Sequence, residues 1–358
     1  MTRLIARLAS LRLTTGCLLA LGLLVLWGTL YQVEFGLYAA QQRFFASWVF
    51  LAGGFLPVPG TQLVLTVLFA NLLASMLTQM RFGWRHAGVL LIHAGILLLL
   101  GGGFVIHHHA QESFLTLAEG EGSNLSASYQ EWELAAWEKG QGARRTVYAA
   151  DLDKDRVGER IVFQDLGLEV EVQTYYGNCR PAAADLQPVP ISREPAENMP
   201  GGNVRLHTGA GDPQPVQLYG GNLQAASVSV GEREIEVSLR RKRFQLPLLV
   251  KLIDFRREVH PGSRIPKYYG SLVEVDTSSG ARPVLIEMNK PLRYRGYTLY
   301  QASFSQLQDG AEQSTLAVVR NVGRLLPYAA SILTFIGLVI HFALALGRRP
   351  PRREGSGA

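Results

Sequence analysis

The chain has 358 residues, of which 47% are hydrophobic and 18% are charged, against about 25% charged in an ordinary soluble domain. Its formal net charge of +6 does not indicate a nucleic-acid-binding protein, because much of the positive charge flanks apolar runs. Setting aside the nine flanking arginines and Glu354 leaves 26 of the 35 basic and 28 of the 29 acidic residues. The nine are Arg3, Arg7, Arg12, Arg81, Arg85, Arg348, Arg349, Arg352 and Arg353.

Four apolar runs, residues 11–30, 61–78, 87–106 and 325–346, approach or reach the roughly 20 residues that a helix needs to cross a bilayer. Arg12 is their single charged residue. A fifth run, 44–60, has an apolar core of about 13 residues and is interrupted by Pro57 and Pro59. The sequence predicts four transmembrane α-helices, with 44–60 as an interfacial or re-entrant segment.

The positions of the arginines predict the topology. By the positive-inside rule, the N-terminus, the loop at 81–85 and the basic tail 347–358 are cytoplasmic. Four spans put both termini on one side, and residues 107–324 then lie outside. The first run has no small-residue cleavage site after it, and no Ser/Arg-rich transit peptide precedes it. We expect a multi-pass protein of the bacterial inner membrane with a periplasmic domain between the third and fourth spans.

Within 107–324 the hydrophobic pattern has a period of two. It appears in LEVEVQTYY (168–176), REIEVSL (233–239), GYTLYQASF and STLAVVRN, and 271–288 resembles a hairpin with a Ser-Ser-Gly turn at 278–280. No long amphipathic helix interrupts these strands, so the expected fold is an antiparallel β-sandwich or open barrel. The Pro- and Gly-rich stretch 177–202 is predicted to be a long loop.

No catalytic motif is apparent in this domain: hydrolase elbow, zinc-protease and phosphate-loop patterns are all missing from the sequence. The run Gly101–Gly103 lies within a span, where small residues permit close helix packing. The two cysteines, Cys17 and Cys179, lie on different sides of the membrane boundary, so a disulfide between them is not expected. Cys17 is interpreted as a small buried core residue, with a thiol-relay role as the alternative.

Two histidines stand inside predicted spans. His93 lies six residues into the third span and His341 five residues before the end of the fourth, both roughly 8–9 Å from the cytoplasmic end. Two neutral imidazoles at one depth can ligate haem iron from opposite faces. The alternative for each is an imidazole hydrogen-bonded to a neighbouring helix or facing a partner subunit.

Three consecutive histidines, His107, His108 and His109, follow the third span. We expect either a membrane-surface anchor, or the first turn of the outer domain, or a transient site for haem or metal leaving the bilayer. His86 is interpreted as a loop residue, and His207 and His260 as structural.

Several segments together resemble one family. They are the opening span LASLRLTTGCLLALGLLVLWGT, the third span LLIHAGILLLLGG, and the outer segments LLVKLIDFRREVHPGSRIPKYYGSLVEV and NKPLRYRGYTLYQASF. The chain resembles the ResB-like (CcsB) proteins of System II cytochrome c biogenesis over nearly its whole length. The segment NKPLRYRGYTLYQ is the most specific part of this resemblance.

The resemblance implies a partner, a cargo and a ligand. ResB-like proteins pair with a CcsA/ResC-type membrane protein that carries a tryptophan-rich WWD motif, which this chain lacks. Together they carry haem b as a transported substrate and attach it to the C-x-x-C-H cysteines of apocytochrome c. The histidine that aligns with His93 is an axial haem ligand in the family, with the opposite ligand on the partner. This chain is therefore expected to be an accessory subunit of a haem lyase complex.

Further residues are candidates for contacts outside the membrane. Asn289, Arg293 and Arg295 are candidates to bind haem propionates, because guanidinium groups match carboxylate geometry. YRGYTLYQ is a candidate to receive apocytochrome, or else a Gly-centred strand whose tyrosines pack on their neighbours. Two other functions stay open: a membrane b-type cytochrome that passes electrons, with His93 and His341 on one haem, and a haem-free membrane scaffold.

Overall fold

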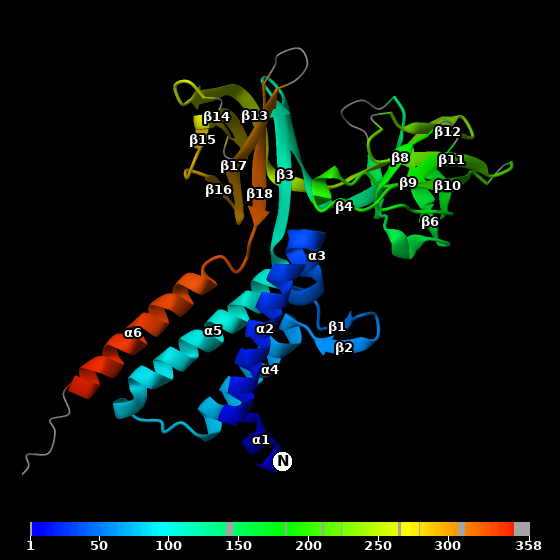
Figure 1. Cartoon of the computed structure of the whole chain (residues 1–358). Coiled ribbons are helices and arrows are strands. Elements are labelled where there is room, and N and C mark those ends of the chain that lie inside the picture. Colours follow the sequence, from blue (N-terminus) through cyan, green and yellow to red (C-terminus); the bar gives the residue numbers. More distant parts are fainter. Residues whose placement is uncertain are drawn as a thin grey trace, which may run out of the picture. The chain divides into compact units, whose positions relative to one another are not determined.

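The computed structural model describes residues 2–140, 146–182, 185–209, 211–222, 224–263, 266–278, 280–306 and 312–346. The predicted tail 347–358 lies outside the described residues. The chain divides into two compact units, Met1–Ala110 together with Asn321–Ala358, and Gln111–Arg320. The first unit is helical and the second is built almost entirely of strands (Figure 1).

The four predicted apolar helices are confirmed. Candidate spans run over Leu11–Phe35, Thr61–Thr78, Trp84–His109 and Leu326–Leu346, each long and apolar enough to cross a membrane. The corresponding α-helices are α2 (Leu11–Phe35), α4 (Thr61–Thr78), α5 (Ala87–His109) and α6 (Leu326–Leu346). A short helix, α1 (Thr2–Leu8), precedes α2, and α3 (Leu37–Ala40) follows it. Because α5 continues to His109, the three consecutive histidines form its last turn.

Helices α5 and α6 pack closely side by side (Figure 1). Three glycines of α5, seven residues apart, are its buried residues: Gly88, Gly95 and Gly102. A Cβ on Gly88 would lie 2.5 Å from the backbone nitrogen of His341, and one on Gly102 would lie 2.9 Å from the Cβ of Leu326. The two helices are therefore antiparallel and in contact through backbone, which is possible only where side chains are missing.

The glycine run 101–103 is only partly used for helix packing. Gly102 faces Leu326 as described, and a Cβ on Gly101 would lie 3.7 Å from Phe69 of α4, at ordinary contact distance. A Cβ on Gly103 would meet no described atom within 4 Å. Only the middle glycine of the run therefore requires its missing side chain.

The segment predicted to be interfacial or re-entrant is not helical across its length. After a π-helical turn at Gln41–Phe45 it forms a hairpin of β1 (Val49–Ala52) and β2 (Leu56–Pro59). Phe44 and Phe50 are buried in a cluster with Cys17, while Phe55 at the hairpin tip is 81% exposed. The interpretation of Cys17 as a buried core residue is confirmed.

A buried asparagine fixes the joint between α1 and α2. Asn71 of α4 is 1% exposed, and its amide donates to the carbonyl oxygens of Leu8 and Ser10. The hydroxyl of Thr14 donates to the Asn71 Oδ1 at 2.6 Å. Carbonyl groups freed where one helix ends and the next begins thus find donors inside an apolar environment, where unpaired groups are costly.

The second unit is mainly β, as predicted, and every strand pair in its described part is antiparallel. A large sheet has the order β15-β14-β13-β4-β3-β18-β17-β16, with β5 paired to β4 and β12 to β13. A four-stranded sheet has the order β11-β10-β7-β6, and β8 pairs with β9. The strands are β3 (Gln111–Ala118), β4 (Gly122–Glu138), β5 (Val147–Asp151), β6 (Arg160–Phe163), β7 (Leu168–Val172), β8 (Cys179–Pro181), β9 (Leu186–Pro188), β10 (Gly201–His207), β11 (Gln214–Tyr219), β12 (Ala226–Val230), β13 (Arg233–Val259), β14 (Pro266–Thr277), β15 (Gly280–Glu287), β16 (Leu292–Tyr294), β17 (Tyr297–Gln306) and β18 (Glu312–Arg320).

The unit has two hydrophobic cores, and the long strand β13 contributes residues to both. One core lies between the four-stranded sheet and the strands β4, β12 and β13, as in a sandwich. The other core is enclosed by the second half of β13 together with β3, β14, β15, β16, β17 and β18. Because β15 also approaches β17, the large sheet curls on itself. The predicted choice between sandwich and open barrel is therefore resolved as one of each, joined by β13 and β4.

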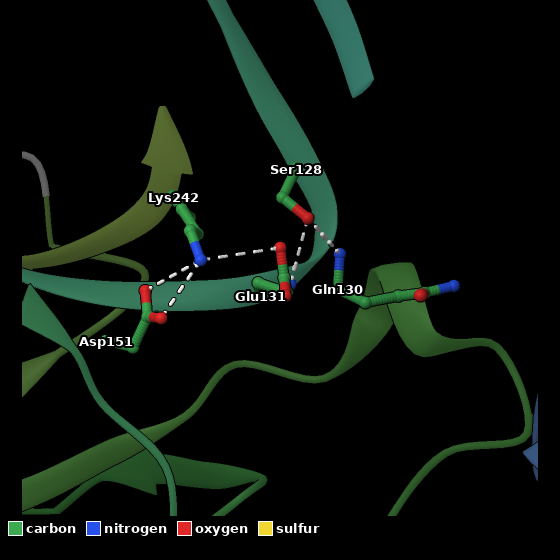
Figure 2. A network of polar contacts seen from close by, with 5 residues as sticks. All are labelled: Ser128, Gln130, Glu131, Asp151 and Lys242. Carbon is green, nitrogen blue, oxygen red and sulfur yellow. Dashed lines mark hydrogen bonds and ion pairs between the residues drawn. The ribbon is translucent and has the colours of Figure 1, made fainter. Parts of the chain in front are cut away.

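Strand β4 bends where it passes from one core to the other. Residues 128–131 of β4 stand opposite Lys242 alone, between the pairs Arg241–Trp132 and Arg243–Ala127. The Ser128 hydroxyl accepts from the backbone nitrogens of Gln130 and Glu131 at 3.3 and 3.1 Å (Figure 2). Lys242 reaches the carboxylate of Asp151 at 2.9 Å and that of Glu131 at 3.9 Å (Figure 2). Such bulges bend a strand and redirect its side chains.

Two local predictions need correction and one holds. The strand predicted over 168–176 ends at Val172, and the predicted loop 177–202 contains the short hairpin of β8 and β9 before β10 begins. Prolines at the ends of these strands weaken the period-two pattern that would reveal them. The hairpin predicted over 271–288 is confirmed as β14 and β15, with Thr277 paired to Gly280; residue 279 lies outside the described residues.

Candidate functional site

The ring of His93 is held by its own helix. Its Nδ1 lies 2.8 Å from the carbonyl oxygen of Val89, one turn earlier in α5. A carbonyl can only accept, so Nδ1 carries the proton and donates it. In a neutral imidazole, Nε2 then keeps its lone pair. No hydrogen bond to Nε2 is formed by a described residue. A histidine fixed in this tautomer is prepared to coordinate a metal through Nε2.

The side chain of His93 lies away from the α5–α6 contact. We call the row of buried glycines of α5 that faces α6, Gly88, Gly95 and Gly102, the glycine seam. His93 follows Gly88 by five residues and precedes Gly95 by two, which places it roughly 140–160° around α5 from this seam. The residue is half-buried. Other side chains on that side of α5, Ile96 at 37% and Phe104 at 52%, are exposed in the chain alone. His93 therefore lies on a face that another molecule can cover.

His341 has a different setting from the one expected. Its backbone packs against Gly88, so it is level with a residue five positions, or roughly 7.5 Å, from His93. Its side chain is exposed, with the ring of Phe342 at 5.6 Å between centroids. The equal depth inferred from counting residues thus fails in the packed helices, because the ends of α5 and α6 are not level. Whether His341 binds haem stays a prediction.

The three histidines at the end of α5 are all exposed and differ in their contacts. His107 Nε2 contacts the side-chain amide of Gln62 at the start of α4. His108 Nδ1 lies 2.9 Å from the carbonyl oxygen of Phe104. Within the described ranges no group of three or more His, Cys, Asp or Glu side chains is arranged to hold a metal ion. The triplet does not form a three-ligand metal site there.

Arg293 lies in the short strand β16, Asn289 precedes this strand and Arg295 follows it, and all three residues are exposed. Asn289 (φ 65°) and Arg295 (φ 43°) have left-handed backbone conformations. Arg295 and Gly296 form the two-residue turn between the paired residues Tyr294 and Tyr297. The strand predicted to be centred on Gly296 is therefore a hairpin turn.

Charge around β16 is unevenly compensated. Glu287 accepts from Lys290 Nζ at 2.5 Å and from the hydroxyl of Tyr268 at 2.8 Å. The hydrogen bond from Lys290 is the main cause that lowers the pKa of the Glu287 carboxyl. Among the described residues Arg293 has no ion pair, and Arg295 contacts the Ser278 hydroxyl at 3.5 Å and lies over the Tyr294 ring at 5.5 Å from its centroid, with no carboxylate partner. Lys290 is thus neutralised locally, while two guanidinium groups are free to bind a carboxylate ligand.

The sequence offered two roles for the tyrosines of this hairpin, packing on their neighbours or contact with apocytochrome, and the structure separates the tyrosines accordingly. Tyr294 and Tyr297 pack against the core of the curled sheet, and Arg320 lies over the ring of Tyr297 at 5.6 Å. Tyr300 is 42% exposed. The structural interpretation holds for the first two, and Tyr300 alone presents its ring to solvent.

Sequence reasoning missed the groups that orient the histidines. Val89 and Phe104 act through backbone carbonyls four residues before His93 and His108, and any residue type can supply a carbonyl. Gln62 could have been noticed as a polar residue at the start of an apolar run. Its partner His107 lies 45 residues away, and such pairing follows only from the packing of α4 against α5.

Four apolar helices are long enough to cross a bilayer, which is typical of a membrane protein, and a large antiparallel β region lies between the third and fourth along the chain. The ResB-like family matches residues 74–315, more than half of the chain, and this chain belongs to that family. It is also 29% identical to Protein NrfI of Wolinella succinogenes over 120 residues, which cover 33% of this chain and 13% of NrfI. The chain thus matches only a small part of that relative. Together these similarities indicate involvement in cytochrome c biogenesis.

Proposed function

We propose that this chain is the ResB-type subunit of a System II cytochrome c synthase, which helps to carry haem b across the membrane and presents it for covalent attachment to apocytochrome c. Haem is the cargo of this protein and not a resident cofactor. The attachment chemistry belongs mainly to a CcsA/ResC-type partner with a WWD motif. This chain then acts as an accessory, non-catalytic subunit of the lyase.

The observation that carries the proposal is the tautomer of His93. Its Nδ1 donates to the Val89 carbonyl oxygen at 2.8 Å, so Nε2 offers a lone pair from inside an apolar helix. Ferric or ferrous haem iron accepts neutral imidazole nitrogen, and the apolar macrocycle is compatible with the side chains around it. His93 would hold the iron on one axial side.

The second axial ligand is proposed to come from the partner subunit. His93 is turned away from α6, on a side of α5 where Ile96 and Phe104 are exposed. A partner helix that covers this side would bring its own ligand to the opposite face of the haem and bury both side chains. The site is then complete only in the complex.

The arginine distribution supports the orientation of the complex. With the termini and the 81–85 loop in the cytoplasm of a bacterium, α5 runs outward and the β region lies in the periplasm. Haem would leave His93 toward the end of α5 that carries the three histidines. No nucleic acid takes part, and the surrounding lipid bilayer contacts the exposed apolar faces of the helices.

The β region is proposed to hold the acceptor polypeptide and the polar edge of haem near the exit. Arg293 and Arg295, with Asn289 beside them, are exposed, and neither guanidinium has a carboxylate partner among the described residues. Propionates are suitable ligands, because guanidinium groups bind carboxylates with two parallel hydrogen bonds. The exposed ring of Tyr300 offers an apolar contact for a peptide on the same strand pair.

The other two functions make different demands on the same residues. An electron-carrying b-type cytochrome would need His93 and His341 on one haem, yet their axial offset of roughly 7.5 Å and the direction of His93 away from α6 disfavour this within one chain. A haem-free scaffold would leave the Nε2 lone pair of His93 without use.

Absorption spectra of this chain, purified alone and with its partner, test the proposal. A haem Soret band that is present in the complex and weakened by His93→Ala is the expected result. A full band on the isolated chain that requires both His93 and His341 would favour the b-type cytochrome. The absence of a Soret band from every preparation would favour the haem-free scaffold and contradict haem transport.

A further inference from the structure

A groove lies between α2 and the hairpin of β1 and β2, which stand beside each other (Figure 1). Its volume is about 380 Å³, and every described side chain that lines it is apolar or aromatic. One side is formed by α2 from Ala20 to Leu30, and the other by Val58 and Pro59 of β2. Such a groove admits a chain of methylene groups but not a helix, whose diameter with side chains is about 10–12 Å.

The groove has the length of one lipid leaflet. From Ala20 to Leu30 its lining extends along α2 for roughly 15 Å, at 1.5 Å per residue. The hydrocarbon core of a bilayer is about 30 Å thick, so one leaflet contributes about half of that. The Leu30 end of the groove lies near Phe35, where α2 ends. With the N-terminus in the cytoplasm, the groove is in the outer leaflet.

Arg43 stands at the Leu30 end of the groove. Its guanidinium carbon lies 5.3 Å from the ring centroid of Tyr31, the residue that follows Leu30, and 5.7 Å from that of Phe50. The ring of Phe50 in turn contacts Trp27, which lines the groove, at 5.7 Å between centroids. The apolar lining and the guanidinium are therefore parts of one surface, with the charge at the end where the lipid headgroups begin.

The guanidinium of Arg43 is held in place but not neutralised. Its Nη2 donates to the carbonyl oxygen of Leu51 at 2.7 Å, and its Nη1 donates to the hydroxyl of Tyr31 at 3.4 Å. These two hydrogen bonds use two of the five N–H donors of the side chain. Among the described residues no carboxylate pairs with Arg43. The other donors can bind a phosphate, which matches the geometry of a guanidinium group.

We propose that this groove binds one phospholipid, with an acyl chain along α2 and the phosphate on Arg43. The charge decides between occupants, because an uncharged chain would satisfy the groove and leave the guanidinium without a counter-ion. The bound lipid would fill the space beside Trp27 and tie the hairpin to α2. The site requires that α2 spans the bilayer, and it does not depend on haem.

Lipid titration of the full-length chain tests the proposal. The chain, stripped of lipid in detergent, is titrated with phosphatidylglycerol or with diacylglycerol of the same acyl chains, and bound lipid is counted by native mass spectrometry. One phosphatidylglycerol should bind more tightly than diacylglycerol. Arg43→Gln should weaken phosphatidylglycerol at least about tenfold, as expected for a lost hydrogen bond to a charged group, and leave diacylglycerol unchanged. Arg81→Gln, which removes an exposed arginine beside another apolar run, should affect neither lipid.

Two further variants separate the groove from the charge. Leu23→Trp places a larger side chain in the groove and should weaken both lipids to the same extent, so that the preference for phosphatidylglycerol remains. Arg43→Lys keeps the positive charge and should retain part of that preference. Circular dichroism should show wild-type helix content in each variant, and Arg43→Lys and Leu23→Trp still test the site if Arg43→Gln does not fold.

Four results would overturn the proposal. Arg43→Gln could bind phosphatidylglycerol as the wild type does, or it could lose diacylglycerol equally, which would give Arg43 a structural role in the hairpin. An isoprenoid quinone that co-purifies in place of phospholipid and is lost with Leu23→Trp would identify another ligand. Loss of the lipid when the partner subunit binds would make the groove a protein interface. The haem Soret band of the wild-type complex is a separate measurement, so the proposed function stands or fails independently.

Discussion

Gly88 of α5 and His341 of α6 are in backbone contact, so closely that a Cβ on Gly88 would lie 2.5 Å from the His341 nitrogen. This contact fixes the register of the two helices. It brings His341 level with the first turn of α5, while His93 lies more than one turn further along. The two histidines of the candidate spans therefore occupy different levels, and His93 is the one whose Nδ1 donates to a backbone carbonyl, which leaves Nε2 for the proposed haem iron.

The seam between α5 and α6 predicts a contrast between two glycines of one helix. A Cβ at Gly95 would overlap Thr334 Oγ1 and lie 2.9 Å from the Ala330 oxygen, whereas one at Gly103 meets no described atom within 4 Å. Gly95→Ala should destabilise the helix pair by about 1–3 kcal/mol through overpacking. Gly103→Ala should be neutral or stabilising by up to about 1 kcal/mol, because alanine favours helix. Unfolding in detergent, followed by circular dichroism, measures the stability of both variants. Equal effects of the two substitutions would contradict close packing of α6 against the glycine seam.

Two ion pairs of equal length in the β region should contribute very differently to its stability. Arg240 and Glu133 are 2.8 Å apart with side chains only 16% and 7% exposed, and Lys139 and Glu234 are also 2.8 Å apart but half exposed. Glu133→Ala leaves a buried guanidinium unpaired and should cost about 3–5 kcal/mol in chemical denaturation. Glu234→Ala should have a far smaller effect that disappears in salt.

Replacement of both partners of the buried pair provides the control. Arg240→Met with Glu133→Leu should recover most of the lost stability, because an apolar pair of similar volume avoids the desolvation cost. A double variant as unstable as Glu133→Ala would show that packing, not the unpaired charge, causes the loss.

Glu171 and His207 predict an acid-sensitive contribution to the stability of the β region. The hydrogen bond from His207 Nε2, at 2.9 Å, is the main cause that lowers the pKa of Glu171 from its usual 4.5, although burial opposes it. The stabilisation is therefore complete above pH 4.5 and is lost as the pH falls through the lowered value. Trp132 lies in the same hydrophobic core as Val170 and Val172, the neighbours of Glu171, and reports the unfolding of this core by fluorescence. Glu171→Gln should reduce the loss of stability at acidic pH, which we call the acid limb of the stability–pH profile.

A matched variant keeps this prediction specific. Glu169, on the same strand, lies 3.6 Å from Arg160 and has no histidine partner in the described structure. Glu169→Gln should leave the acid limb closer to wild type than Glu171→Gln does. If the two variants behave alike, the hydrogen bond from His207 is not the source of the pH dependence.

The proposed topology can be tested with single cysteines. Cys17 and Cys179 are both buried, which keeps the background of thiol labelling low. Arg282 in β15 and Arg81 in the 81–85 loop are exposed. In spheroplasts, Arg282→Cys should react with a membrane-impermeant maleimide, and Arg81→Cys should react only after permeabilisation. The reverse pattern would place the β region in the cytoplasm and exclude attachment outside.

The helices could be predicted because a span requires only enough consecutive apolar residues, which α2, α4, α5 and α6 have. The contacts between them could not. Gly101, Gly102 and Gly103 are equivalent in the sequence, and only the register against α6 selects Gly102 for contact with Leu326. For the same reason, counting residues from the ends of two spans placed His93 and His341 at one level, although packing separates them.

The strands were predictable where alternation is strict, as in β14 and β15, and not where turn chemistry is unusual. Arg295–Gly296 adopts positive φ at both positions, but the common hairpin signal is Asn-Gly or Asp-Gly, so this segment resembled a continuous strand. For the candidate site, the depth of His93 in an apolar run drew attention to it. The proton on Nδ1 depends on the geometry of the Val89 carbonyl, which no sequence pattern specifies.

The identity of the iron ligand in the complex tests the central claim most directly. Near-infrared magnetic circular dichroism distinguishes two imidazole ligands from one imidazole and one thioether. It should be recorded on the haem-loaded complex with and without His93→Met. The account predicts a bis-imidazole spectrum that changes to an imidazole–thioether or five-coordinate spectrum with His93→Met. The same spectrum and haem content in both proteins would show that His93 does not bind the iron.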